Sequence, residues 1–97
     1  SRHRLDQLQI KGYLISVEQL HNEQIWDSVN EFMKIAPMKL RMMFYQPEYI
    51  CITAVRADHR ALKYVWDQTY KVCESAVERD VTAIEFIRDP VMKHLFV

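Results

Sequence analysis

The sequence predicts an α+β domain with the ferredoxin-like βαββαβ topology, a sandwich in which a four-stranded antiparallel sheet carries two helices on one face. Two observations lead to this prediction. Two segments carry apolar residues at the spacing of an amphipathic helix, and four shorter segments are rich in the β-branched and aromatic residues typical of strands. Their order places two right-handed crossovers around one hairpin, which brings both helices to the same face.

The first half of the chain supplies a strand and a helix. Residues 1–8 are predicted to form a flexible N-terminal segment, and the single folded domain covers residues 9–90. A β-rich run over residues 9–17 predicts the first strand. Asn22 predicts the start of the first helix as an N-cap, although Ser16 with Gln19 fits an earlier capping box. Its apolar stripe consists of Ile25, Val29, Phe32 and Ala36, and Pro37 predicts its end.

Residues 38–55 are predicted to form a β-hairpin. From Met38 to Tyr45 apolar and polar side chains alternate, as on a strand with one covered face. A short turn at residues 46–48 leads to a second β-rich run that ends at Val55. The apolar register of the first of these strands is expected to lie under the helices and consists of Met38, Leu40, Met42 and Phe44.

A long second helix and a last strand complete the predicted domain. Asp58 is expected to cap the helix, whose buried stripe includes Trp66. Residues 81–87 predict the fourth strand, and the apolar tail at residues 91–97 is expected to add an edge strand or to dock on a partner. Trp26 either completes the core or lines a groove between the helices. No internal repeat is evident.

Composition argues against several classes of function. Thirteen Lys and Arg balance thirteen Asp and Glu, which argues against a dedicated duplex-DNA binder. The sequence holds no metal-ligand spacing, catalytic triad motif or nucleotide-binding loop, so no metal, cofactor or catalytic residue is predicted and an enzyme is not favoured. No apolar run is long enough to span a membrane. Cys51 and Cys73 are expected to be free thiols, which predicts a cytoplasmic protein.

The sheet face away from the helices is the predicted functional surface. Its aromatic, basic and apolar side chains form a patch of the kind that marks binding sites. The leading hypothesis is a small non-enzymatic protein-interaction or regulatory module that self-associates as a homodimer through this face. The alternative is a single-stranded RNA-binding domain that uses the same face. The predicted partner-binding residues are Tyr13, Ile15, Lys39, Arg41, Met43, Tyr45 and Tyr49.

Two charged clusters offer further sites. Cations near the start of the second helix are candidates for binding an anion at the helix N-terminus, or are ordinary surface residues. They are Arg56, His59 and Arg60. Acids spaced four residues apart on the first helix form either a docking stripe for a basic partner or a solvated helix face. They are Glu23, Asp27 and Glu31.

Overall fold

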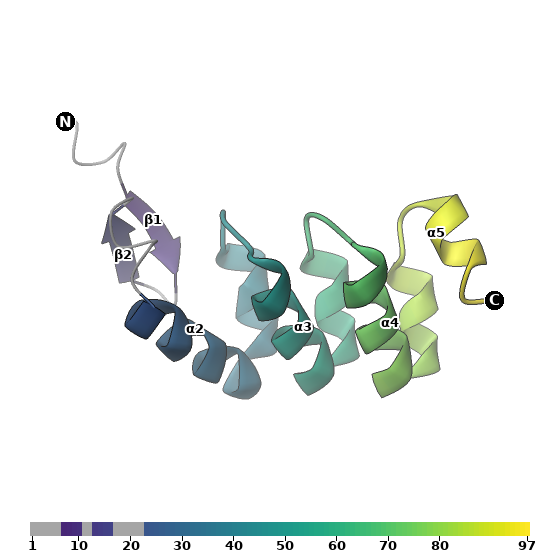
Figure 1. The fold of residues 1–97 in the computed structure, drawn as a ribbon, viewed down its shortest axis with the longest axis horizontal. Coiled ribbons are helices and arrows are strands. Elements are labelled where there is room, and N and C mark those ends of the chain that lie inside the picture. The colour runs from purple at the N-terminus through teal and green to yellow at the C-terminus, as the bar shows by residue number, and fades with distance from the viewer. Residues whose placement is uncertain (1–6, 11–12, 17–22) are drawn as a thin grey trace.

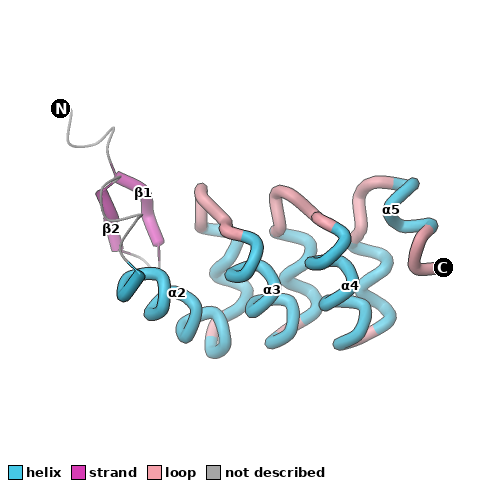
Figure 2. Tube along the Cα trace, viewed as in Figure 1, coloured by secondary structure: helices cyan, strands magenta, loops and turns pink. Residues whose placement is uncertain are grey.

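The computed structural model of the chain describes residues 7–10, 13–16 and 23–97. It begins with an antiparallel hairpin formed by β1 (Gln7–Ile10) and β2 (Tyr13–Ser16), in which Gln7 pairs with Ser16 and Ile10 with Tyr13 (Figure 1). The region predicted as a single first strand therefore turns back on itself. The remainder of the described chain consists of helices and short loops (Figure 2).

Helices of two kinds alternate after the hairpin. The α-helices form one row and the 3-10 helices, denoted η, lie behind them in a second row (Figure 1). The short α5 follows the last η helix at the C-terminal end. The bounds are α2 (Glu23–Ile35), η2 (Pro37–Met42), α3 (Glu48–Ala57), η3 (His59–Tyr64), α4 (Tyr70–Arg79), η4 (Val81–Phe86) and α5 (Pro90–His94).

The predicted ferredoxin-like α+β sandwich is wrong. Within the described residues the only sheet is the two-stranded β1–β2 hairpin. The predicted hairpin over residues 38–55 consists of η2 and α3, the predicted strand at residues 81–87 is η4, and the tail contains α5 instead of an edge strand.

The error lies in the period of the apolar pattern. A 3-10 helix places residues i and i+3 on one side, and Leu40 with Met43 is such a buried pair in η2 and its C-cap. Leu62 with Val65 repeats it in η3. The alternating pattern shares only Leu40 with this arrangement, so Phe44, predicted to be covered, is 73% exposed.

Of the two predicted helices, only the first agrees with the structure. The first was confirmed, because α2 ends at Ile35, two residues before Pro37. The second was wrong in extent. Asp58 caps the six-residue η3, and α4 starts only at Tyr70, with Thr69 as its N-cap. Trp66 consequently lies in the loop between them and is 67% exposed instead of buried.

The chain contains an internal repeat of 22 residues, contrary to the sequence analysis. The start of α4 at Tyr70 lies 22 residues after the start of α3 at Glu48, and η4 follows η3 at the same interval. We call residues 46–67 and 68–89 the first and second units. The equivalent positions that carry the same amino acid are Gln46 and Gln68, Cys51 and Cys73, Ala54 and Ala76, Val55 and Val77, Asp58 and Asp80, Ala61 and Ala83, and Asp67 and Asp89.

A glutamine at the start of each unit joins neighbouring η helices. The Gln46 side-chain amide donates to the carbonyls of Leu40 and Tyr64, at 3.1 and 2.9 Å, and its oxygen accepts from the Trp66 backbone N–H at 2.8 Å. Gln68 makes the same three bonds one unit later, to residues 62, 86 and 88. Each glutamine thus satisfies the last carbonyl of the following η helix, Tyr64 or Phe86, and adds a second bond to the Leu40 or Leu62 carbonyl, which also accepts a C-cap N–H.

The stacked units bury a continuous core between the two rows. Ala54, Ala76 and Ala83 have no exposed surface, which allows helices of successive units to approach closely. The molecule extends over 47 × 24 × 18 Å, an elongated shape (Figure 1). This arrangement is a short α-solenoid, in which each unit contacts mainly its neighbours in sequence.

Candidate functional site

A groove on the η row brings together residues from three turns of the solenoid. It has a volume of about 360 Å³ and lies where η2, η3 and the loop after η4 meet. We call it the η groove; its lining residues are Arg41, Lys63, Tyr64, Val65, Trp66 and Arg88. A second hollow of similar size, lined in part by Lys39 and Met42, adjoins it through Arg41.

Two cations lie near one aromatic ring in this groove. The Arg41 guanidinium carbon lies 5.9 Å from the centre of the Tyr64 ring, and the Lys63 ammonium lies 5.5 Å from it. Arg41 and Lys63 are themselves equivalent positions, 22 residues apart. Cation–π attraction at these distances keeps both charges near the ring while leaving their donors open to a ligand.

Trp66 is exposed but fixed. Its indole Nε1 donates to the Met43 carbonyl at 3.0 Å, and its backbone N–H donates to Gln46 at 2.8 Å. The side chain is therefore held against the preceding turn although two thirds of the residue surface faces solvent. An aromatic side chain that is ordered before a ligand arrives loses little conformational entropy on binding.

Arg88 occupies the position equivalent to Trp66 and makes an analogous contact. Its guanidinium donates to the carbonyl of Val65, which stands 23 residues before it, just as Met43 stands 23 residues before Trp66. It also donates to the carbonyls of Lys63 and Trp66, at 3.3 and 3.1 Å. These bonds to neutral carbonyls hold the side chain in place and leave its positive charge unbalanced.

The groove is electropositive. Among the described residues no carboxylate lies within ion-pair distance of Arg41, Lys63 or Arg88. Glu85 takes the place of Arg41 and Lys63 in the last η helix, so the positive strip ends at η4. The three cations suit negatively charged groups of a ligand, and the two aromatic rings suit its flat or apolar groups.

The predicted partner-binding residues do not share one face. Lys39 and Arg41 lie together on η2 and are exposed, but Met43 is buried in the core at 1% exposure. Tyr45 packs edge-on against Trp26, which is a core residue, with ring centres 5.6 Å apart. Tyr49 lies in the first turn of α3 and is half-exposed, whereas Tyr13 and Ile15 belong to β2.

Sequence reasoning missed Lys63, Tyr64, Trp66 and Arg88. Helical and strand periods cannot bring these residues to Arg41, because the relevant spacing is the 22-residue unit. The paired Gln, Cys and Asp residues at this interval were the signal that would have revealed it.

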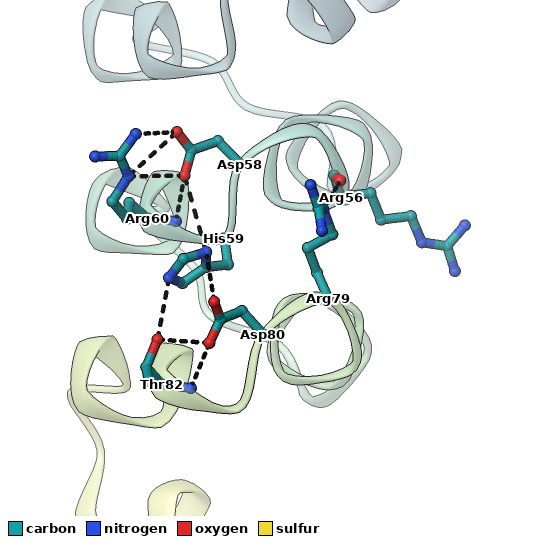
Figure 3. Close-up of polar contacts among 7 residues, drawn as sticks. All are labelled: Arg56, Asp58, His59, Arg60, Arg79, Asp80 and Thr82. Carbon is teal, nitrogen blue, oxygen red and sulfur yellow. Dashed lines mark hydrogen bonds and ion pairs between the residues drawn. The ribbon is translucent and has the colours of Figure 1, made fainter.

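The cations predicted to bind an anion lie among carboxylates (Figure 3). Arg60 forms an ion pair with Asp58 at 2.6 Å, and the His59 ring lies 3.8 Å from a carboxylate oxygen of Asp80. The Arg56 side chain points away from this cluster, and its carbonyl accepts a bond from Arg79. The three cations therefore do not converge on one point.

The same cluster tethers successive η helices at their N-termini. Asp58 accepts from the Arg60 backbone N–H, and Asp80 accepts from that of Thr82. The Arg60 side-chain hydrogen bond lowers the pKa of Asp58, and the Thr82 hydroxyl lowers that of Asp80. His59 spans the two caps, with Nε2 3.2 Å from the Thr82 hydroxyl. We interpret this cluster as a structural link between units.

The predicted acidic stripe lies on α2. Glu23 is the first residue of the helix, and Asp27 and Glu31 are exposed one and two turns later. Glu31 forms an exposed ion pair with Lys34 at 2.6 Å. Asp27 and Glu31 border a shallow hollow of about 430 Å³ on the side of α2 that Ile35 also lines.

Chemistry at the cysteines is suppressed by burial. Burial raises the pKa of Cys51 to about 12, aided by the charges of Asp67 and Glu48, and burial also raises the pKa of Cys73. Both thiols are free. No cluster of His, Cys, Asp and Glu suited to a metal ion occurs in residues 7–10, 13–16 and 23–97. None of the described helices is long and apolar enough to cross a membrane.

Comparisons with known proteins identify no relative. No protein-family model, no curated protein and no solved structure matches the chain.

Proposed function

We propose that the chain is a non-enzymatic interaction module of the α-solenoid type, which binds an extended acidic segment of a partner protein in the η groove. The observation that carries this proposal is the exposed Trp66 side chain, held by the Met43 carbonyl beside three cations without carboxylate partners. Solenoids use the surface formed by successive units to bind extended ligands. Self-association through an open sheet face is not carried forward, because the described chain has no such sheet.

A protein ligand is favoured over a nucleic acid by the charge balance. The whole chain has a formal net charge of zero, and the electropositive strip is short because Glu85 closes it. Binding of a phosphate backbone usually draws on a larger surplus of cations. A few carboxylates together with an aromatic or apolar side chain would match the groove better. The two free, buried thiols are also consistent with action in the reducing cytoplasm.

The test is a titration with a defined acidic peptide. A labelled peptide of alternating Glu and Tyr is added to the chain, and fluorescence anisotropy gives the dissociation constant. Lys63→Glu should weaken binding by at least about tenfold, because a like charge replaces an attractive one. The matched control is Lys71→Glu, which makes the same change at an exposed lysine of α4. Equal affinity of both variants would contradict the proposal.

Single-stranded RNA is the second candidate ligand. Tyr64, with two cations near its ring, and the exposed Trp66 ring resemble the stacking platforms on which bases lie. The RNA arm of the experiment uses oligouridylate at several salt concentrations. A high affinity for oligouridylate that falls steeply as the salt concentration rises would favour RNA as the ligand. Weak binding that Lys63→Glu leaves unchanged would exclude RNA.

A further inference from the structure

The side of α2 away from Asn30, whose side chain contacts Thr53 of α3, carries a shallow hollow and an exposed apolar side chain. Its hollow is lined by Asp27, Ser28, Glu31 and Ile35, together with Phe32. Ile35 is 83% exposed, an unusual exposure for an isoleucine in a helix. We call this surface the head of the solenoid.

The internal repeat allows the head to be compared with the equivalent sides of α3 and α4. The residues equivalent to Ser28 are Ile50 in α3 and Val72 in α4, and both are fully buried. The residue equivalent to Glu31 in α3 is Thr53, whose hydroxyl lies 2.6 Å from the Asn30 side-chain oxygen of the preceding helix. In both units this side of the α-helix therefore packs against another helical turn of the solenoid.

The opposite end of the molecule has complementary chemistry. Beyond α4, the short α5 is anchored through Phe96, whose ring stacks on Tyr70 with centres 5.2 Å apart. Its outer side leaves Val91 74% and Leu95 62% exposed. Its last turn is basic, with Lys93 and His94. We call this surface the tail. The head on α2 is thus acidic and apolar, and the tail on α5 is basic and apolar. The two helices lie toward opposite ends of the molecule, with the β1–β2 hairpin at the same end as α2 (Figure 1).

We propose that the head of one copy binds the tail of a second copy, so that chains stack end to end and extend the solenoid. Asp27 would face Lys93 and His94 beside the Glu31–Lys34 ion pair, and Ile35 would be covered by Val91 and Leu95. Because head and tail are different surfaces, the contact is heterologous, and addition of copies does not stop at a dimer unless a ring closes. This proposal is independent of ligand binding in the η groove.

Light scattering of the full chain tests the stacking directly. The average mass should rise with concentration above twice 11.7 kDa, measured from about 10 µM to about 1 mM. Asp27→Lys and Lys93→Glu should each shift the half-assembly concentration upward by about tenfold. An equal mixture of the two variants should assemble again, because each reversed surface meets an opposite charge on the other variant.

Matched substitutions away from both ends provide the controls. Asp67→Lys makes the same charge change as Asp27→Lys at an exposed loop residue, and Phe44→Asp matches Ile35→Asp at another exposed apolar side chain. Both controls should assemble like the unmodified chain, whereas Ile35→Asp should not. Since Ile35 and Phe44 are both exposed, circular dichroism should show that all variants remain folded.

Three outcomes would overturn the proposal. They are a constant mass of one chain, assembly that ends at a dimer, and assembly that Asp27→Lys and Lys93→Glu leave unchanged. Lys63→Glu separates this proposal from the previous one, because it should weaken binding of the acidic peptide while leaving the concentration dependence of the mass intact.

Discussion

Gln46 in the first unit and Gln68 in the second make the same three hydrogen bonds, whereas Trp66 and Arg88, also at equivalent positions, present different chemistry to solvent. The residues that are identical in both units include Ala54 and Ala76, which lie in the core. The comparison shows that the fold constrains a small set of positions at a 22-residue interval. The remaining surface positions are free to differ, and the η groove is built from them.

The largest expected difference concerns the two thiols. With a pKa of about 12, native Cys51 should react with iodoacetamide at pH 8 about a thousandfold more slowly than in the unfolded chain. Burial raises the pKa of Cys73 too, but the nearby charge of Arg88 partly offsets this rise. Cys73 should therefore react first. Mass spectrometry of labelled peptides measures both rates. Faster labelling of Cys51 than of Cys73 would contradict the predicted order.

Loss of either glutamine should destabilise the solenoid to a similar extent. Gln46→Ala or Gln68→Ala leaves one carbonyl, that of Tyr64 or Phe86, and one N–H without a partner, a cost of about 2 kcal/mol at about 1 kcal/mol for each group. Urea denaturation measures this loss. Gln68→Glu is a useful companion variant, since a carboxylate accepts the Arg88 N–H but cannot donate. Two losses that differ by several-fold would show that the units are not equivalent.

Replacement of Trp66 should be tolerated if the new side chain can still donate a hydrogen bond to the Met43 carbonyl. Trp66→Ala removes the bond to the Met43 carbonyl and should cost about 1 kcal/mol. Trp66→Arg should cost less, because Arg88 shows that a guanidinium can reach the equivalent carbonyl. Thermal unfolding of both variants distinguishes these results. Equal destabilisation by Ala and Arg would contradict a shared tethering role.

The smallest expected effects concern the caps Asp58 and Asp80. Asp58→Ala should cost about 1 kcal/mol, the usual loss for an N-cap, and Asp80→Ala should act in the same direction. The pKa values of both carboxyls are lowered from 3.8, so their contribution is complete above the unfolded-state pKa. It is lost as the pH falls through the folded-state pKa. Urea midpoints below pH 4 should thus fall less in the double variant than in the original chain.

Part of the architecture followed from local sequence. The apolar spacing from Ile25 to Ala36 and the stop at Pro37 predicted α2 correctly, because a helix of this length is specified by one amphipathic stripe. Asp58 was also recognised as a cap, although the helix after it was given the wrong length and type. Lys39 and Arg41 were identified as surface cations; Arg41 lines the η groove, and Lys39 lines the adjoining hollow.

Only the tertiary structure decided the rest. In segments as short as residues 38–44 and 81–87, a strand and a 3-10 helix bury overlapping sets of apolar residues, so the local pattern does not choose between them. Gln46 and Gln68 favour the helical arrangement, because each bonds to carbonyls of two successive η helices. The groove likewise depends on stacking, since Arg41, Trp66 and Arg88 are far apart along the chain and meet only when the turns lie side by side.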